Sequence, residues 1–345
     1  MSMSKPLGVA VIGAGYWGPN LIRNFGGSAL WDLLWVCDLD EARATRVVGR
    51  HSATRITTSI SDVLDDPAVD AVAIATPAAT HVGVGLECLR AGRHVLIEKP
   101  LASSSADAEK LVQEAESRGL SLMCDHTYCY TPAVRRIREL VSSGALGEIQ
   151  YVDSVRVNLG LVQRDIDVMW DLAPHDLSIL DFVLPEHRRP LAVAAHGADP
   201  IGAGRACVGY MVLPLGGNAI AHVHVNWLSP TKIRTMIIGG SERMLVWDDL
   251  NPSQRLSIFD KGVEIGDGLS GEERRTAQIS YRSGDMVAPA LPEYEALGAV
   301  VTEFADSIHE RRPALTDGHA GLRVLRWLEA GSKSLLSSGI SVPVF

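Results

Sequence analysis

The first 126 residues alternate short, fully apolar runs with amphipathic or polar stretches of helical length. A strand that is buried on both faces reads as a continuous apolar run, and strands separated by helices are typical of a parallel sheet. We therefore predict an α/β domain over residues 1–126, with a doubly wound parallel sheet. The predicted strands are 9–12, 33–37, 71–75, 94–97 and 121–124, and the predicted helices are 19–25, 60–64, 82–91 and 103–118.

The pattern changes after His126. One amphipathic helix is predicted at 132–142, and strands then follow without helices between them, which is typical of an antiparallel sheet. We therefore predict an α+β domain over residues 127–345. Its predicted strands are 149–159, 206–213, 219–227, 235–238, 244–247 and 255–259. Two late helices, at 293–311 and 321–337, are expected to cover one edge of this sheet or to return to the first domain.

A glycine-rich motif follows the first predicted strand and opens the first helix. Gly13, Gly15 and Gly18 form the Gly-x-Gly-x-x-Gly fingerprint of dinucleotide-binding domains. In this fingerprint the first glycine allows the tight turn, the second lets the backbone approach a pyrophosphate, and the third lets the helix pack on the strand. The motif predicts a Rossmann domain whose helix N-terminus faces the phosphates.

An acidic residue at the end of the second strand strengthens this prediction. Asp38 follows Gly18 by 20 residues, which is the interval expected for a carboxylate that binds the ribose hydroxyls of NAD. This carboxylate would repel a 2'-phosphate, so we predict NAD as the cofactor. Arg43 and Arg46 follow closely and leave NADP as the alternative.

Composition excludes several classes of protein. The formal net charge of −9 and the absence of a basic cluster argue against nucleic acid as a partner. No apolar run reaches the roughly 20 residues of a membrane span, and Met1–Gly8 has no signal-peptide pattern, so we expect a cytoplasmic protein. The five cysteines include no Cys-x-x-Cys pair, which favours reduced packing residues over a zinc site.

The apolar run at 94–97 ends abruptly at Glu98, Lys99 and Pro100. Ligands of open α/β sheets bind just beyond the carboxyl ends of the strands, so Lys99 is expected in the cleft. The loop 76–81, which follows the preceding strand, should line the same cleft.

Asp171 and His175 are the main candidates for chemistry in the second half. They are four residues apart around Pro174, so both can project from one face of a helix whose first turn holds the proline. A helix N-terminus would keep His175 neutral and available as a base, and a nearby carboxylate can orient its ring. The alternative is that Asp171 only caps the helix and that His175 is a surface residue.

Two further sets of polar residues have competing interpretations. His222, His224 and Asn226 alternate on one face of a strand, and we expect a subunit contact there rather than a metal site. Arg156, Arg164 and Arg234 could bind a diphosphate or be ordinary surface arginines. The acidic neighbours of Arg164, Asp165 and Asp167, favour sugar hydroxyls over phosphate in that loop.

These motifs together resemble the glucose-fructose oxidoreductase, inositol dehydrogenase and MocA family (Gfo/Idh/MocA). The resemblance is carried by the glycine motif 13–18, by Thr76-Pro77 with His81, by Glu98-Lys99-Pro100, and by Asp171 with His175. It implies a Rossmann domain joined to a large open, mainly antiparallel sheet that binds substrate and forms homodimers or homotetramers. It also implies that NAD(P) carries a hydride to or from a carbon of a sugar or cyclitol.

Finer details resemble the branch of this family that acts on nucleotide-linked sugars, including dehydrogenases and ketoreductases at the third ring carbon. These details are the segments 15–20, 126–128 and 170–176, and Arg156 with Asn158. The resemblance implies Lys99, His175 and Asp171 as catalytic residues and a cis bond between Lys99 and Pro100. It implies cofactor contacts at Gly13, Gly15, Tyr16, Trp17, Gly18, Asp38, Thr76, Pro77, His81, Glu98, Lys99 and Pro100, and substrate contacts at Lys99, Tyr128, Arg156, Asn158, Asp171 and His175.

We therefore expect an NAD-dependent oxidoreductase that interconverts an alcohol and a ketone on a nucleotide-linked sugar. One alternative is a dehydrogenase of a free polyol or sugar such as myo-inositol. An alternative of another class is a non-catalytic sensor or assembly protein that binds NAD. A third possibility is an enzyme that recycles tightly bound NAD in place.

Overall fold

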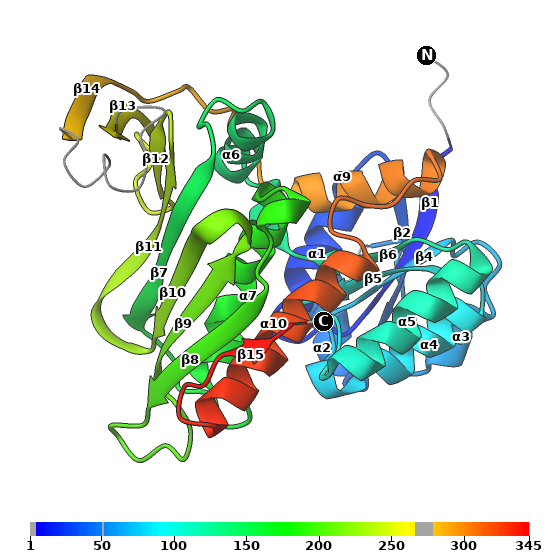
Figure 1. Cartoon of the computed structure of the whole chain (residues 1–345). Helices are drawn as coiled ribbons and strands as arrows, with labels where there is room; N and C mark the ends of the chain where they lie inside the picture. Colours follow the sequence, from blue (N-terminus) through cyan, green and yellow to red (C-terminus); the bar gives the residue numbers. More distant parts are fainter. Residues whose placement is uncertain (1–4, 50–51, 266–278, 345) are drawn as a thin grey trace. The chain divides into compact units, whose positions relative to one another are not determined.

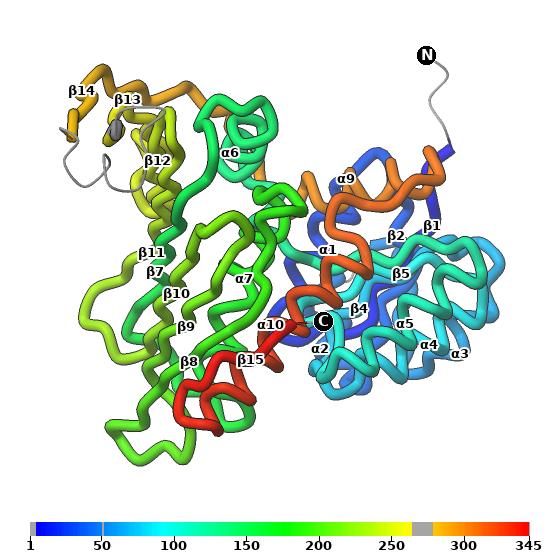
Figure 2. Tube along the Cα trace, viewed as in Figure 1, coloured from blue at the N-terminus to red at the C-terminus, as the bar shows by residue number. Residues whose placement is uncertain are grey.

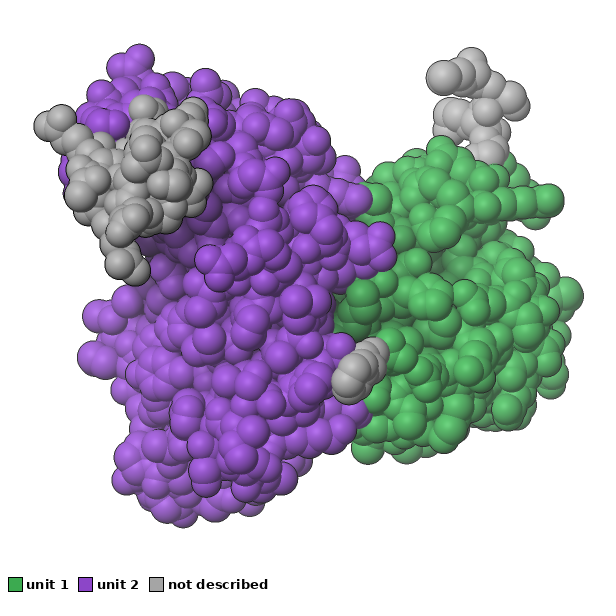
Figure 3. All heavy atoms as spheres, viewed as in Figure 1, with its two compact units in different colours: residues 1–131, 293–326 green, residues 132–292, 327–345 purple. Residues whose placement is uncertain are grey.

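The computed structural model describes residues 5–49, 52–265 and 279–344, so the predicted start at Met1–Gly8 lies partly outside the described residues. The chain divides into two compact units (Figure 3). Unit 1 comprises Met1–Thr131 and Glu293–Arg326, and unit 2 comprises Pro132–Pro292 and Trp327–Phe345. The predicted domain boundary between residues 126 and 127 stays a prediction.

Unit 1 is built on a parallel sheet of six strands in the order β3-β2-β1-β4-β5-β6 (Figure 1). This order is the doubly wound arrangement of dinucleotide-binding domains, and it confirms the predicted fold class. The strand β3 was not predicted, because three residues carry too little pattern. The strands are β1 Leu7–Ile12, β2 Trp31–Cys37, β3 Arg55–Thr57, β4 Ala71–Ile74, β5 His94–Glu98 and β6 Leu122–Asp125. The helices between them are α1 Gly18–Gly26, α2 Glu41–Val48, α3 Ile60–Leu64, η1 Ala78–Thr80, α4 His81–Arg90 and α5 Ser105–Arg118.

The late helix α9, Ala296–His309, belongs to unit 1. It packs against α1, and the tube in Figure 2 shows the chain returning to the first unit there. The Trp31 ring stacks on Phe304 with ring centroids 5.4 Å apart, and its Nε1 donates to the carbonyl of Val301 at 2.8 Å. Of the two roles predicted for the late helices, α9 therefore has the second, the return to the first unit.

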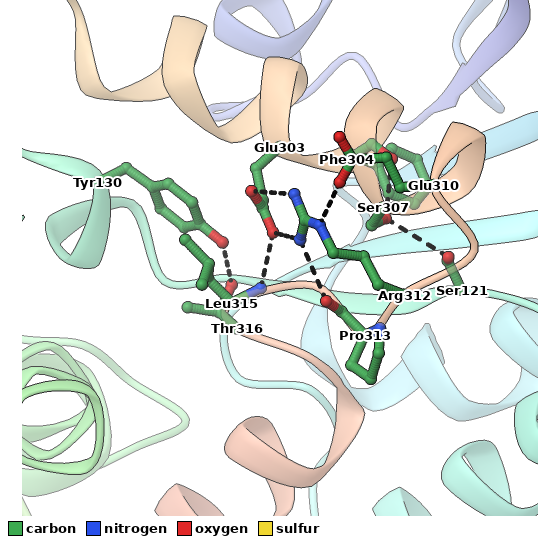
Figure 4. A network of polar contacts seen from close by, with 10 residues as sticks. All are labelled: Ser121, Tyr130, Glu303, Phe304, Ser307, Glu310, Arg312, Pro313, Leu315 and Thr316. Atoms are coloured by element: carbon green, nitrogen blue, oxygen red, sulfur yellow. Dashed lines mark hydrogen bonds and ion pairs between the residues drawn. The ribbon is translucent and has the colours of Figure 1, made fainter.

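A polar network holds the segment after α9 against the end of β6 (Figure 4). The buried Glu303 carboxylate accepts hydrogen bonds from Arg312 Nη1 at 2.5 Å and from the Leu315 amide at 2.9 Å. The Thr316 hydroxyl donates to the carbonyl of Cys124 at 2.8 Å and lies 2.9 Å from the Tyr130 hydroxyl. This network fixes the turn η2, Thr127–Tyr130, which follows β6 directly.

Unit 2 is built on a sheet of nine strands in the order β14-β13-β12-β11-β7-β10-β9-β8-β15. Among the described strands of this sheet only β7 and β10 pair in parallel, so the sheet is mainly antiparallel as predicted. The strands are β7 Ile149–Leu159, β8 Ala192–Ala198, β9 Val208–Leu215, β10 Ala219–Asn226, β11 Leu228–Gly240, β12 Met244–Asp248, β13 Leu256–Ile265, β14 Ile279–Val287 and β15 Val342–Pro343. The helices are α6 Pro132–Ser142, α7 Val168–Val183, η3 Glu186–Arg188, η4 Gly216–Asn218 and α10 Gly318–Leu336, the last of which contains the third change of unit, after Arg326.

The two faces of this sheet differ. Helix α7 packs on β7, β9 and β10, and alternate residues of β10 are buried. His222 and His224 occupy the other positions of β10, where the Tyr210 ring of β9 stacks on both, with its centroid 4.4 Å from that of His224. The described residues contain no group of three side chains that could hold a metal ion. The subunit contact predicted for this face stays a prediction.

In the described ranges, no helix has the length and apolar character that crossing a membrane requires. All five cysteines are buried, and none is bonded to another.

Candidate functional site

The turn after β1 leaves room for a phosphate group. Gly13 has φ +99°, and a Cβ atom there would lie 2.7 Å from the Ala75 carbonyl oxygen. A Cβ atom on Gly18 would lie 2.1 Å from the Gly13 carbonyl oxygen, whereas one on Gly15 would meet nothing within 4 Å. Packing therefore requires the first and third glycines, and open space lies over the second. No side chain among the described residues caps the N-terminus of α1, and a helix N-terminus of this kind suits the pyrophosphate of a dinucleotide.

Asp38 lies directly after β2 and contacts this turn. Its Oδ2 accepts a hydrogen bond from the Ala14 amide at 2.6 Å, and its Oδ1 accepts one from the Asp40 amide at 2.8 Å. Arg43 forms ion pairs with Asp38 at 3.6 Å and with Asp40 at 3.3 Å. The predicted ribose carboxylate is thus held beside the glycine turn, and the nearby arginine is engaged by carboxylates.

His81 joins the loops that follow β4 and β5. Its Nε2 lies 2.9 Å from the carbonyl oxygen of Thr76, and its Nδ1 lies 2.8 Å from that of Pro100. The side chain is 1% exposed, and burial lowers its pKa. A neutral ring donates only one hydrogen bond, so one of the two carbonyls accepts from it at a time. The predicted cofactor role of His81 stays a prediction, and its visible role is to hold the loop with Thr76 and Pro77 against Pro100.

Lys99 follows the last residue of β5, and its bond to Pro100 is cis, which confirms the predicted isomer. The residue before it, Glu98, pairs in register with Asp125, the last residue of β6. Asp125 is buried and accepts hydrogen bonds from Trp17 Nε1 at 3.2 Å and from Thr127 Oγ1 at 2.7 Å.

Asp125 is 1% exposed, and the Oε2 atom of the half-buried Glu98 is shielded from water without a hydrogen-bond partner among the described residues. Burial, followed by the charge of Asp125, raises the pKa of Glu98 well above its ordinary value. Burial also raises the pKa of Asp125, and the Lys99 ammonium opposes the rise at both carboxyl groups. Sequence reasoning listed Glu98 but missed Asp125, whose signal is its place at the end of the neighbouring strand.

His126 continues this cluster. It is 2% exposed, and neither ring nitrogen has a hydrogen-bond partner among the described residues. Burial, with a smaller effect from the Lys99 charge, lowers the pKa of His126 to about 3, so its ring is neutral at physiological pH. Tyr128 follows on η2 and is half-buried, whereas Tyr16 of the glycine turn is exposed.

In unit 2, helix α7 begins earlier than the sequence indicated. Asp167 is the N-cap, and its carboxylate accepts hydrogen bonds from the amides of Met169 at 2.9 Å and Trp170 at 3.0 Å. Pro174 therefore lies in the second turn, so its predicted place in the first turn is wrong. The idea that Asp171 only caps the helix is also wrong. Because the helix dipole acts mainly on the terminal turn, it has less influence on His175 than we expected.

Asp171 and His175 both lie on α7, four residues apart, and so share one face of the helix. Asp171 Oδ2 accepts a hydrogen bond from Trp227 Nε1 at 2.9 Å. The Trp227 side chain is buried after β10, so this bond fixes the carboxylate relative to the sheet.

Arg156 has a structural partner within unit 2. Its Nε donates to Asp176 Oδ2 at 2.7 Å, and Ser154 Oγ donates to Asp176 Oδ1 at 2.8 Å. Arg156 is 2% exposed, so the pair fastens α7 to β7 inside the unit. Its predicted substrate contact stays a prediction, as does that of the half-buried Asn158 on the same face of β7.

The other two candidate arginines differ in their surroundings. Arg164 is exposed, and Arg234 forms an ion pair with Asp249 at 3.5 Å.

Comparisons with known proteins cover both units. Residues 7–126 match the family described as "Oxidoreductase family, NAD-binding Rossmann fold", and residues 134–246 match the "GFO/IDH/MocA C-terminal domain".

Individual relatives agree with this assignment. The UDP-N-acetylglucosamine 3-dehydrogenase of Acidithiobacillus ferrooxidans is 28% identical over 316 residues, which cover 91% of this chain and 93% of that enzyme. Inositol 2-dehydrogenase 2 of Saccharopolyspora erythraea is 30% identical over 52% of this chain and 54% of that enzyme. The crystal structure of GenD2 from gentamicin A biosynthesis, in complex with NAD, has a TM-score of 0.81 at 26% identity and covers 100% of this chain and 98% of its own. The chain therefore belongs to the Gfo/Idh/MocA family and is an oxidoreductase of alcohol groups with an NAD-binding Rossmann domain.

Proposed function

We propose that this protein is an NAD-dependent oxidoreductase that interconverts a secondary alcohol and a ketone at the third ring carbon of a nucleotide-linked sugar. The observation that carries the proposal is the match to a UDP-N-acetylglucosamine 3-dehydrogenase, because it extends over 91% of this chain and so includes both units. A match confined to the NAD-binding unit would support only the assignment of the cofactor and not that of the substrate.

Each proposed catalytic residue has one task in the oxidation direction. NAD, when bound, supplies the acceptor for the hydride that leaves the carbinol carbon. His175 takes the hydroxyl proton, and the Lys99 ammonium stabilises the negative charge that develops on the oxygen until the carbonyl forms. Asp171, whose carboxylate is fixed by Trp227, orients the imidazole. In the reduction direction His175 returns the proton.

The surroundings of Asp38 support NAD over NADP. Its carboxylate would repel a 2'-phosphate, and Arg43 already pairs with Asp38 and Asp40. Because the guanidinium is held by two carboxylates, it is a weaker partner for an added phosphate.

The first test is ligand-induced thermal stabilisation of the purified chain. The panel contains NAD, NADP, UDP-sugars, dTDP-sugars and myo-inositol, because any ligand that binds the native state raises its apparent stability. We expect a shift with NAD that grows when one nucleotide-linked sugar is added. A shift that grows only with myo-inositol would overturn the proposed substrate class.

The second test is turnover with the compound that the panel identifies. Lys99→Ala and His175→Ala are each expected to lower kcat by about 100- to 10,000-fold while NAD still stabilises the protein. Lys110→Ala on α5 and His309→Ala at the end of α9 are matched controls on exposed side chains. Turnover like that of the wild type in both active-site variants would contradict the assignment.

A free polyol is the second candidate substrate. It is favoured by the 30% identity to an inositol 2-dehydrogenase, although that match covers 52% of this chain. The same panel separates the two candidates, since only a nucleotide-linked sugar requires the nucleotide for binding.

We also propose a homodimer or homotetramer that forms through the open face of the unit 2 sheet. The stack of the exposed Tyr210 on the half-buried His222 and His224 supports this placement.

A further inference from the structure

We propose that a cavity at the start of strands β5 and β6 is a second ligand site, which binds a small organic anion with one carboxylate group on an apolar body. The cavity has a volume of about 640 Å³, which is typical of sites for small molecules. Its lining residues all belong to unit 1. Because the strands of this sheet are parallel, their starts lie at the opposite edge from the glycine turn that follows β1, so the cavity is separate from the proposed NAD site.

Four segments of unit 1 form the walls of the cavity. They are the first residue of β5, the second half of α5 with the start of β6, the end of α9 with the turn that follows it, and the start of α10. The lining includes Val112, Leu122 and Ala314, whose apolar side chains are buried. An apolar ligand body therefore has a surface on which to pack, and the polar lining groups determine which charged group it carries.

His94, the first residue of β5, supplies a hydrogen-bond donor. The Ser121 amide donates to its Nδ1 atom at 2.9 Å, so the proton of the neutral ring is on Nε2. Burial lowers the pKa of His94, and the Asp70 charge opposes this, so the ring is neutral at physiological pH. No described residue accepts a hydrogen bond from Nε2, and this atom is not one of the buried unpaired nitrogen atoms, so a ligand in the cavity can reach it.

The Ser121 hydroxyl is a second donor in the lining. Its neighbour Ser307 uses its own hydroxyl hydrogen to bind the carbonyl of Phe304 at 2.8 Å. The contact between the Ser307 and Ser121 hydroxyls is 3.4 Å long (Figure 4), which is too long for a strong hydrogen bond. The Ser121 hydroxyl can therefore turn toward a carboxylate without the loss of a strong bond.

Arg311 supplies the positive charge. It lines the cavity just after the end of α9, its side chain is exposed, and it forms no ion pair with a described residue. The neighbouring Arg312 differs, because its guanidinium is held by the buried Glu303. Arg311 therefore offers its charge to a carboxylate ligand.

Two carboxylates in the lining limit the charge of the ligand. Glu116 pairs with His319 Nε2 at 2.7 Å. Asp317 Oδ1 accepts a hydrogen bond from the Ala320 amide at 2.9 Å. Their charges repel a ligand with two negative charges more strongly than a ligand with one. The site therefore favours a monocarboxylate over a phosphate.

The first experiment is isothermal titration calorimetry of the full chain with NAD bound, with benzoate as the ligand. Benzamide has the same shape without the charge, and inorganic phosphate has the charge without the apolar body. We expect benzoate to bind at least about tenfold more tightly than either, as the loss of a hydrogen bond to a charged group implies. Benzoate that binds no more tightly than benzamide or phosphate would overturn the inference, and so would no binding of benzoate at millimolar concentration.

Two variants test whether benzoate binds in this cavity. Arg311→Gly removes the charge, and glycine suits the φ of +51° at this position, so the turn is preserved. His94→Asn removes Nε2 and keeps an acceptor near the place of Nδ1 for the Ser121 amide. We expect each variant to weaken benzoate binding by about 10- to 100-fold and to keep the NAD-induced thermal stabilisation.

The control for these variants is Arg90→Gln. It removes an exposed arginine of the same unit that does not line the cavity, and it should leave benzoate binding unchanged. Unchanged benzoate binding in Arg311→Gly would overturn the inference, and so would an equal loss in Arg90→Gln, which would reduce the effect to net charge. If one variant loses the NAD-induced stabilisation and so does not fold, the other variant decides.

Nitrogen NMR of the histidine rings gives a readout that does not depend on affinity. The signals that His94→Asn loses identify His94. We expect its neutral ring to carry the proton on Nε2, and we expect benzoate to shift the Nε2 resonance. A proton on Nδ1, or an Nε2 resonance that benzoate leaves in place, would contradict the donor role of His94 and overturn the inference.

Discussion

The two units each bury a polar cluster, and the clusters differ in the sign of their charges. In unit 1 the carboxyl groups of Glu98 and Asp125 share one site beside Lys99. In unit 2 the Asp176 carboxylate is paired with the Arg156 guanidinium at 2.7 Å and also accepts from Ser154. Asp125 is as buried as Asp176, at 1% exposed each, so the difference between these two carboxylates comes from their partners and not from exposure.

This difference separates a structural cluster from a functional one. Opposite charges in good geometry keep each other ionised, so the unit 2 pair is a fixed link between β7 and α7. In unit 1, burial raises the pKa of both carboxyl groups, and the charge of Asp125 raises that of Glu98 further. A raised carboxyl pKa next to a cation is the more informative sign of chemistry.

The largest expected effect comes from breaking the unit 2 pair. Asp176→Ala leaves the Arg156 guanidinium buried without its carboxylate, and we expect a loss of about 3 to 5 kcal/mol in the free energy of unfolding. Urea unfolding measures this loss. Asp153→Ala, at an exposed position of the same strand β7, is the control and should have a small effect. A loss in Asp176→Ala as small as that of the control would show that the pair does not hold the unit together.

The next effect is a pH dependence that belongs to unit 1. The native pKa of Glu98 is raised above the ordinary value of 4.5, so from about pH 4.5 upward the unfolded chain has released a proton that the native protein keeps. Stability at this site is therefore lost as pH rises toward the native pKa. We expect the wild type to lose about 1.4 kcal/mol per pH unit relative to Glu98→Gln in this window.

Unfolding free energies of the two proteins at several pH values between about 5 and 7 test this expectation. The free energy of unfolding of the wild type should fall steadily with rising pH relative to that of Glu98→Gln. Two parallel curves would mean that Glu98 has the same pKa in the native and unfolded states. Glu139→Gln serves as the control, because its exposed carboxylate should leave the slope unchanged.

The smallest expected effect sharpens the description of the unit 2 cluster. Ser154→Ala removes one hydrogen bond to Asp176 Oδ1 and leaves both bonds from Arg156 in place. We expect a loss of about 1 to 2 kcal/mol in the free energy of unfolding, well below that of Asp176→Ala. A loss equal to that of Asp176→Ala would mean that the main contribution to stability comes from the Ser154 hydroxyl and not from the ion pair.

Local pattern predicted most of the elements. The predicted helix 132–142 and strand 149–159 match α6 and β7, because an amphipathic period and a long apolar and β-branched run are strong local signals. In unit 2, β8, β14 and β15 were missed, and β14 is exposed at almost every position. β15 has two residues, and β8 ends in an exposed segment that gives no burial pattern.

The start of α7 shows what local pattern does not decide. Aspartate commonly caps helices, and both Asp167 and Asp171 precede Pro174 in the sequence. The sequence therefore allows either of them to be the N-cap. The choice depends on where Trp227 and the sheet lie, since Trp227 binds Asp171 and leaves Asp167 to bind the helix amides.

The sequence by itself determined the dinucleotide-binding fingerprint, the carboxylate that follows it, the lysine at the end of β5, and the order of parallel and antiparallel regions. Each of these is written in neighbouring residues at a fixed spacing. Only the tertiary structure decided that Asp125 faces Glu98, that Arg156 is buried against Asp176, and that α9 returns to unit 1. These facts depend on which strands become neighbours and which side chains lose contact with water, and a pKa or an ion pair is a property of that environment and not of the residue type.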